Sequence, residues 1–213
     1  MLPVILGAVS LSIWLGLVFA RGSFWRVSRN MPPRVSDAAS SKRVVAVIPA
    51  RNEAEAIGTA LGSLFAQEFC PPLKIVLVDD GSTDGTAEAA RTAARHAGRE
   101  ADLTIVAGEP LPPGWTGKLW AMSQGVARAE RFDPDFLLLT DADIRHGRHS
   151  VAELAAIAEA HGCDLVSYMV KLVCRTVAER ALIPAFVFFF FKLYPPAWTA
   201  SRRKRTAGAA GGC

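Results

Sequence analysis

Hydrophobic and polar positions divide the chain into an apolar opening and a longer, patterned body. Residues 2–20 contain no charged side chain. A helix over this stretch is about 28 Å long at 1.5 Å per residue, close to the thickness of a bilayer's hydrocarbon core. The pattern therefore predicts a transmembrane anchor over residues 1–20. The absence of a preceding basic residue favours an anchor over a cleaved signal peptide, although Val18-Phe19-Ala20 can mimic a cleavage site.

After residue 42, short apolar runs, the first of them rich in β-branched residues, alternate with helical patterns. Five runs predict strands: residues 44–48, 75–78, 103–106, 136–139 and 165–170. Helices are predicted with Ile57, Leu61, Leu64 and Phe65 on one face, and over residues 85–97, 118–130 and 150–161. Asn52-x-x-Glu55 and Ser150-x-x-Glu153 have the spacing of capping boxes. This alternation predicts an α/β fold, a mainly parallel sheet with helices on both faces.

Polar sequence follows three of the predicted strands. Pro49-Ala50-Arg51-Asn52-Glu53 comes after the first strand, Asp79-Asp80-Gly81-Ser82 after the second, and Asp141-Ala142-Asp143 after the fourth. In parallel sheets the carboxyl ends of the strands lie on one edge, where ligands bind. We therefore expect these three segments to meet in one site.

The residue types at this edge suit a phosphorylated ligand. Asp141 and Asp143 can hold Mg²⁺ or Mn²⁺, and such a cation would offset the charge of a departing diphosphate. Asp79 and Asp80 can accept hydrogen bonds from a nucleobase or a ribose. Lys118 follows a turn between two glycines and lies near a helix start, which also favours anions. Taken singly, the aspartates also fit helix caps, and the lysine fits a solvated side chain.

Charge is distributed unevenly along the chain. The sequence has 24 basic and 20 acidic residues, a net charge of +4. Residues 21–43 hold six of the basic residues and 201–213 hold four, so residues 44–200 carry 14 basic and 19 acidic residues, a net charge of −5. An acidic body argues against a nucleic-acid partner. Basic residues placed after the apolar helix put the rest of the chain on the cytoplasmic side of a cell membrane.

Histidines and cysteines indicate no further site. We expect His146 and His149 to be surface residues, because a diphosphate-bound cation does not need imidazole. The four cysteines contain no C-x-x-C pair, which argues against a zinc site and a redox pair. No Walker A, G-x-G-x-x-G or G-x-S-x-G motif occurs.

Four motifs in order resemble the family 2 glycosyltransferases. They are residues 47–53 (VIPARNE), residues 78–84 (VDDGSTD), Gly117-Lys118 and Asp141-Ala142-Asp143. The resemblance implies an inverting enzyme with the GT-A (Rossmann-like) fold. Three further segments, residues 111–121, 179–191 and 205–213, are similar to glycosyltransferases associated with hopanoid biosynthesis, and a carotenoid glycosyltransferase branch is similar too.

The resemblance implies roles for the matching positions. Those that would bind the nucleotide-sugar are Pro49, Arg51, Glu53, Asp79, Asp80, Lys118 and Asp141. Among them, Asp80 would contact uracil or ribose, and Lys118 would face the diphosphate. Asp141 and Asp143 would be the metal ligands, with Asp143 the principal one, for Mg²⁺ or Mn²⁺.

The resemblance also implies a longer enzyme. The family's catalytic base is an acidic residue carboxyl-terminal to the Gly-Gly-Cys region, and no acidic residue follows Glu179 in this chain. We therefore expect no catalytic base here and a general base beyond Cys213. The expected domains are an anchor over residues 1–20, a basic linker over 21–42 and an incomplete glycosyltransferase domain over 43–213.

A second apolar run lies near the carboxyl terminus. Residues 181–191 are apolar and include Pro184, and Lys192, Tyr194 and Trp198 follow. The run is too short to span a bilayer but suits an interfacial helix over residues 181–198. A helix buried against a further part of the protein is the alternative.

These observations together predict a membrane-bound glycosyltransferase. It would transfer a sugar from a nucleotide-sugar, with UDP as the expected nucleotide, to a lipid or lipid-linked acceptor, in hopanoid biosynthesis. Three alternatives stay open at this stage: a nucleotide-sugar-binding fragment without activity, a sugar-nucleotide nucleotidyltransferase and a receiver-type signalling module. The last two fit less well, because the first strand is followed neither by a glycine-rich loop nor by paired aspartates.

Overall fold

The computed structural model describes residues 1–26, 42–201, 203–206 and 208–209. These residues form two compact units. Unit 1 draws on Met1–Pro33 and Lys171–Ala209, and unit 2 on Arg34–Val170. Most of the predicted linker, from residue 27 to residue 41, lies outside the described residues.

Unit 2 contains a parallel sheet of four strands in the order β3-β2-β1-β4. The strands are β1 (Val44–Ala50), β2 (Lys74–Asp79), β3 (Leu103–Ala107) and β4 (Phe136–Leu139). Every residue of β1 is buried, as expected for a central strand covered on both faces. Four of the five predicted strands are thereby confirmed.

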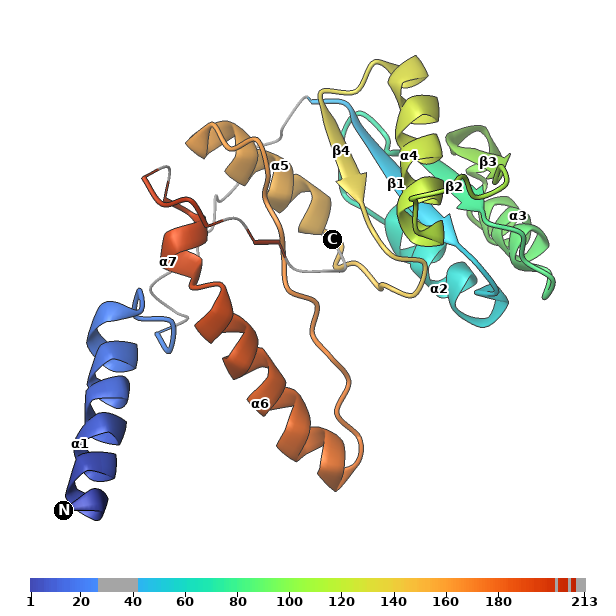
Figure 1. Ribbon diagram of the computed structural model, residues 1–213. Coiled ribbons are helices and arrows are strands. Elements are labelled where there is room, and N and C mark those ends of the chain that lie inside the picture. Colours follow the sequence, from blue (N-terminus) through green and yellow to red (C-terminus); the bar gives the residue numbers. More distant parts are fainter. Residues whose placement is uncertain (27–41, 202, 207, 210–213) are drawn as a thin grey trace. The chain divides into compact units, whose positions relative to one another are not determined.

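Helices cover both faces of this sheet, as predicted (Figure 1). The helices are α2 (Ala54–Phe65), α3 (Thr86–Ala97), α4 (Gly117–Ala129) and α5 (Ser150–His161). Short 3₁₀ turns occupy Glu100–Asp102 and Glu130–Phe132. Alternate residues of β1 point to opposite faces: Ala46 and Ile48 pack in a cluster with side chains of α2, α3 and α5, whereas Val45 and Val47 pack against α4.

Residues 165–170 do not form the predicted fifth strand. The described structure assigns these residues to neither a strand nor a helix. Val166 and Tyr168 pack against the core of unit 2, while Leu165 is largely exposed. Partial burial of apolar side chains against the core therefore arises here without a place in the sheet, which is why the apolar run predicted a strand.

Neither predicted capping box is present. Helix α2 begins after Glu53, and the Asn52 side-chain oxygen instead accepts a hydrogen bond from the Thr83 backbone N–H at 2.9 Å. Helix α5 begins after His149, whose side chain makes no cap, and the Ser150 hydroxyl donates to the Gly147 carbonyl. In both places the polar side chain binds a neighbouring loop rather than its own helix.

Unit 1 is helical. Its elements are α1 (Leu2–Leu15), a π-helical turn η1 (Gly16–Ala20), α6 (Val177–Leu193) and α7 (Pro196–Thr199). The helix over Leu2–Ala20 is long and apolar enough to cross a membrane, a test that a signal sequence near the terminus also passes. The helix predicted over residues 181–198 is divided in the structure: α6 begins earlier, at Val177, and ends at Leu193, and the short α7 follows after Tyr194 and Pro195.

Candidate functional site

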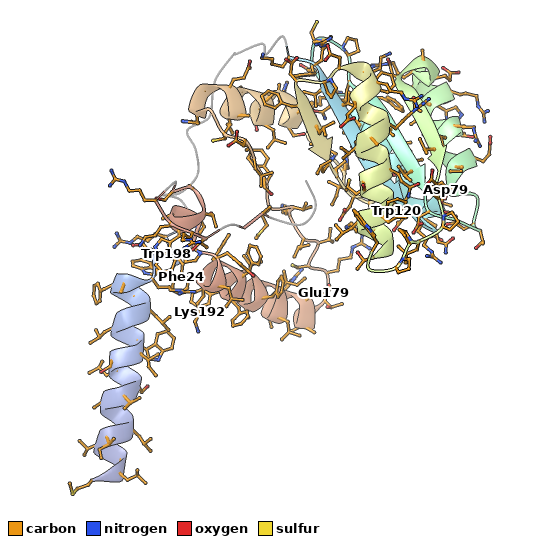
Figure 2. All side chains as sticks on the ribbon, turned by 45° about the horizontal axis from the view of Figure 1, so that its top comes forward. Phe24, Asp79, Trp120, Glu179, Lys192 and Trp198 are labelled. Carbon is orange, nitrogen blue, oxygen red and sulfur yellow. The ribbon has the colours of Figure 1, made fainter. Side chains whose placement is uncertain are left out.

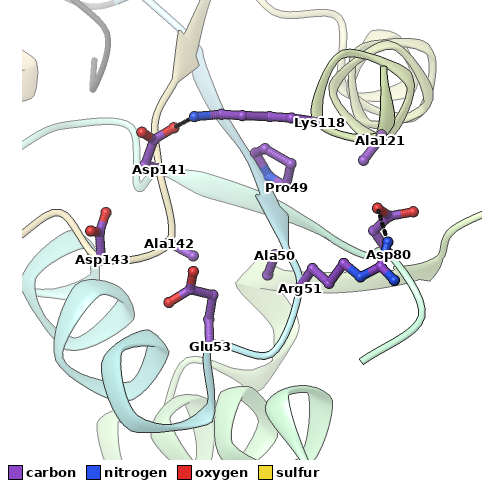
Figure 3. A pocket seen from close by; sticks show the side chains of 11 residues that line it. Pro49, Ala50, Arg51, Glu53, Asp80, Lys118, Ala121, Asp141, Ala142 and Asp143 are labelled. Carbon is purple, nitrogen blue, oxygen red and sulfur yellow. Dashed lines mark ion pairs between the residues drawn. The ribbon is translucent and has the colours of Figure 1, made fainter. Parts of the chain in front are cut away.

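A pocket of about 340 Å³ lies at the carboxyl ends of β1, β2 and β4 and beside the start of α4 (Figure 3). The chain adds β2 and then β3 on one side of β1 and β4 on its other side, so the strand order reverses beside β1, which makes this edge a topological switch point. The residues that line the pocket are Pro49, Ala50, Arg51, Glu53, Asp80, Gly117, Lys118, Ala121, Asp141, Ala142 and Asp143.

The structure brings the candidate residues together, with one exception. Every position expected to bind the nucleotide-sugar or the metal lines this pocket apart from Asp79. Asp79 ends β2, and its carboxylate accepts a hydrogen bond from the Ser82 backbone N–H at 3.0 Å. Asp79 therefore shapes the turn that carries Asp80, while Asp80 itself faces the pocket.

Two ion pairs cross the pocket (Figure 3). Lys118 Nζ lies 2.6 Å from Asp141 Oδ1, which joins the start of α4 to the end of β4. Arg51 lies 3.7 Å from Asp80 Oδ2, which joins the loops after β1 and β2. Both cationic side chains are well exposed, at 61% and 69%, so each can exchange its carboxylate partner for an anionic ligand.

The balance of charges in the pocket suits a divalent cation. Four acidic and two basic side chains line it, a formal charge of −2. Among the described residues, no three His, Cys, Asp or Glu side chains form a group that could hold a metal by themselves. Asp141 and Asp143 offer two hard oxygen ligands, and Mg²⁺ usually takes one or two carboxylates together with phosphate oxygens and water. The residues therefore fit a cation that is shared with a phosphorylated ligand.

The loops after β1 and β2 are fastened to each other. The Ser82 hydroxyl accepts from the Asn52 N–H at 3.0 Å, and the Thr86 hydroxyl accepts from the Glu53 N–H at 2.9 Å. Asn52 has a positive φ of 56°, in the left-handed region that asparagine tolerates better than most residues. These bonds fix the backbone between Arg51 and Glu53, both of which line the pocket.

Asp84 caps two helices at once. One carboxylate oxygen accepts from the Ala54 N–H at the start of α2, and the other accepts from the N–H and the hydroxyl of Thr86 at the start of α3. The Thr86 hydroxyl, followed by the Ala54 N–H, lowers the pKa of Asp84. The cap of α2 joins segments 30 residues apart, so it leaves no local signal in the sequence.

His146 is buried, not a surface residue as expected from the sequence. Only 8% of it is exposed, and its Nε2 lies 3.0 Å from the Thr140 hydroxyl. Its backbone N–H donates to the Ser63 hydroxyl of α2 at 2.9 Å. Burial lowers the pKa of His146. Thr140 and His146, which flank the Asp141–Asp143 segment, are thus tied to each other and to α2. His149, in contrast, is exposed, as predicted.

Gln67 completes the support of this loop and was missed by sequence reasoning. Its amide donates to the Gly147 carbonyl at 2.6 Å, and its side-chain oxygen accepts from the Val151 N–H at 3.1 Å. Ser63 lies in the last turn of α2, and Gln67 follows the helix, which ends at Phe65; the Gln67 amide also donates to the Ser63 carbonyl at 3.0 Å. Two uncharged polar residues at the carboxyl end of a helix whose other face is apolar were the available signal.

The sequence is similar to a known protein family and to curated relatives. The family described as glycosyl transferase family 2 matches residues 45–209 of the chain. A curated relative, the 4,4'-diaponeurosporenoate glycosyltransferase of Staphylococcus aureus, is 33% identical over 113 residues, which are 53% of this chain and 27% of the relative. The matched part of this chain thus spans about a quarter of the relative's length.

Two solved structures are similar in fold. Staphylococcus aureus TarS (residues 1–349) in complex with UDP is 25% identical, covers 63% of this chain and 38% of its own, and has a TM-score of 0.51. The mannosyltransferase PcManGT from Pyrobaculum calidifontis, in complex with GDP-Man and Mn²⁺, is 25% identical, covers 81% of this chain and 48% of its own, and has a TM-score of 0.57.

Proposed function

Since the chain belongs to glycosyl transferase family 2, we propose that it forms the donor-binding part of an enzyme that transfers a sugar from a nucleotide-sugar. The proposed donor is a UDP-sugar and the proposed acceptor is a lipid-type hydroxyl. The observation that carries the proposal is the pocket itself, which gathers carboxylates from the ends of three strands around the amino end of α4. Dinucleotides and nucleotide-sugars bind α/β sheets at such an edge.

The nucleoside and the diphosphate of the donor would contact different groups of the pocket. Asp80, which is only 21% exposed, would accept hydrogen bonds from the uracil or the ribose. Lys118 and Arg51 would face the diphosphate, since both reach into the pocket and are paired only with exchangeable carboxylates. The amino end of α4, at Gly117, adds backbone N–H groups that favour an anion.

Asp141 and Asp143 would hold Mg²⁺ or Mn²⁺ together with the donor's phosphate oxygens. When bound there, the cation would offset the negative charge of the departing diphosphate. The proposal is supported by the pocket's formal charge of −2 and by the Mn²⁺ complex of the similar mannosyltransferase.

The proposed reaction is a single displacement with inversion. The acceptor oxygen forms a bond to the anomeric carbon as the bond from that carbon to the diphosphate oxygen breaks. The acceptor proton passes to a general base, and the nucleoside diphosphate leaves with the bonding electrons. Lys118 would stay close to the leaving oxygen atoms, where a cation stabilises the developing charge.

The acceptor and the location follow from other parts of the chain. Similarity to a diaponeurosporenoate glycosyltransferase supports a lipid-type acceptor, and a role in hopanoid biosynthesis extends that proposal. The helix over Leu2–Ala20 would anchor the chain in the cell membrane. The basic residues that follow this helix in the sequence would place unit 2 on the cytoplasmic side.

Calorimetric titration of the detergent-solubilised chain with UDP, with and without Mn²⁺, tests the donor site. We expect binding that requires Mn²⁺ and that is lost in Asp143→Asn. The matched control is Asp164→Asn, which removes an equal charge from an exposed position outside the pocket. Equal binding by Asp143→Asn and the control would overturn the metal assignment, and no UDP binding by a folded chain would overturn the uridine donor.

A further inference from the structure

Helix α6 exposes an apolar surface that an aqueous environment does not favour. None of its residues, Val177–Leu193, is buried in the described structure. Leu182 is 69% and Phe186 61% exposed. Apolar side chains follow one another without interruption from Phe186 to Phe191, so this stretch has no polar side. A helix that is apolar all round is usually surrounded by a protein core or by lipid.

Charged residues mark both ends of this apolar stretch. Glu179 and Arg180 precede it, and Lys192 follows it. The uncharged segment between them, residues 181–191, is about 16 Å long at 1.5 Å per residue. A bilayer's hydrocarbon core is about 30 Å thick, so α6 is too short to cross it. Its charged ends can both reach the same headgroup layer, because long cationic side chains extend toward water while their stems lie in lipid.

The end of α6 is tied to the end of the predicted anchor. Arg21 is the first charged residue after the apolar helix. Its Nε donates to the Lys192 carbonyl at 3.0 Å and its Nη2 to the Leu193 carbonyl at 3.3 Å. Phe24 packs edge-on against Phe188 at 5.1 Å between ring centroids. A cation at a helix carboxyl end satisfies free carbonyls and complements the helix dipole.

Aromatic and cationic side chains gather at the joint between the two helices, where Arg21 meets the carboxyl end of α6 (Figure 2). The Arg21 guanidinium lies 4.9 Å and the Lys204 ammonium 5.2 Å from the centroid of the Trp198 ring. Gly22, with a φ of +63°, allows this close approach, since a Cβ there would lie 2.7 Å from Trp198 Nε1. Tryptophan at headgroup level and cations facing anionic lipid are typical of a membrane interface.

We propose that α6 lies in the interfacial layer of an anionic lipid bilayer, beside the anchor helix, and that Arg21 holds its carboxyl end at headgroup level. This proposal rests on the proposed anchoring of Leu2–Ala20. Lipid is favoured over a protein groove, because the carboxyl end of α6 lies beside Trp198 with Arg21 and Lys204 over its ring, and tryptophan next to cations is typical of the headgroup layer. The proposal makes unit 1 a membrane-binding unit that contacts the bilayer through both the anchor helix and α6.

Depth-dependent quenching tests the position of α6. The full chain, with its native cysteines changed to serine, is reconstituted in phosphatidylcholine–phosphatidylglycerol vesicles with a fluorophore on Phe189→Cys. Two further labels serve as references, Ile13→Cys in α1 for lipid and Glu159→Cys at an exposed position of α5 for water. We expect the Phe189 label to be quenched several-fold more by nitroxide on the upper acyl chain than by aqueous iodide.

The reference labels separate the outcomes. Lipid quenching at Ile13 with iodide quenching at Phe189 would overturn the interfacial position and leave the anchor intact. Quenching of Phe189 by neither agent would show that protein covers α6, which also overturns the proposal. Failure of lipid quenching at Ile13 itself would overturn the anchor, and the position of α6 with it.

The joint is tested by changing Arg21. We expect Arg21→Ala to lower the lipid quenching of the Phe189 label and to raise its quenching by iodide, with helix content unchanged by circular dichroism. Arg131→Ala is the matched control, because it removes the same charge from an exposed position in unit 2. Equal quenching ratios in the two variants would overturn the role of Arg21.

Discussion

Lys118 links two elements of the pocket through a contact that a ligand can replace. Its Nζ lies 2.6 Å from Asp141 Oδ1, yet 61% of the lysine side chain is exposed. An exposed ion pair contributes little to stability, about 0–1 kcal/mol, so the lysine loses little by turning to another anion. A diphosphate offers more negative charge than one carboxylate. We therefore expect Lys118 to act in binding the donor rather than in stabilising the fold.

Replacing Lys118 with methionine should weaken UDP binding and leave stability nearly unchanged. A hydrogen bond to a charged group contributes about 1.5–3 kcal/mol, so the Kd for UDP in the presence of Mn²⁺ should rise roughly 10- to 100-fold. Calorimetry measures this change, and Arg131→Met is the control, because it removes an exposed charge outside the pocket.

Uridine distinguishes the diphosphate contact from a general disturbance of the pocket. Competition titrations should show Lys118→Met and the parent chain binding uridine equally, because uridine has no phosphate. Asp80→Asn should instead weaken both uridine and UDP, since Asp80 is assigned to the nucleoside. An equal loss of uridine affinity in Lys118→Met would contradict the assignment of Lys118 to the diphosphate.

Helix α4 packs closely against the sheet at a glycine, Gly125. A Cβ built on Gly125 would lie 2.4 Å from Val47 Cγ1 and 3.0 Å from Val78 Cγ2. Val47 and Val78 are buried strand residues with no room to move. Gly125 therefore sets how closely α4 approaches β1 and β2, and with it the position of Lys118 two turns earlier in the same helix.

Gly125→Ala should destabilise unit 2 by about 1–3 kcal/mol, the cost of overpacking a dense core. This cost opposes and exceeds the gain of up to about 1 kcal/mol that alanine brings to a helix interior. Gly62→Ala is the matched control, because Gly62 lies within α2 with open space around its Cα. Urea unfolding should shift its midpoint down for Gly125→Ala and up for Gly62→Ala, and shifts of the same sign would refute the packing argument.

Strands and loops differed in how far the sequence predicted them. The runs that became β1, β2, β3 and β4 were recognised because a short, mainly apolar run is a local signal. Asn52 was misread as a cap, because its partner Thr83 lies 31 residues away. His146 was misread as a surface residue for the same reason, since Ser63 holds it from 83 residues away. Contacts between distant loops leave no periodic pattern.

The pocket could be predicted without knowledge of the strand order. In a parallel sheet all carboxyl ends lie on one edge, so the segments after β1, β2 and β4 had to share that edge whatever their order. The order β3-β2-β1-β4 then decides which ends are adjacent. Strand β3 is at the far edge, and no residue from its end lines the pocket. This arrangement is the GT-A type of fold expected from the motifs, and the similar solved structures share it.

Acidification should destabilise unit 2 in two stages. Burial lowers the pKa of His146 below 6.5, so the folded state binds fewer protons there than the unfolded state. The free energy of unfolding is therefore undiminished above pH 6.5, and it declines as the pH falls toward the pKa of His146 in the folded protein. Despite the cost of desolvation, Lys74 and Arg99 lower the pKa of Asp102, and this contribution is lost only below about pH 3.8.

Urea midpoints, followed by fluorescence in a variant that keeps only Trp115 and Trp120, should therefore decline from pH 7 to 5 and again below pH 4. His146→Gln should flatten the first decline and leave the second, whereas exposed His149→Gln should change neither. An unchanged first decline in His146→Gln would exclude His146 as its source.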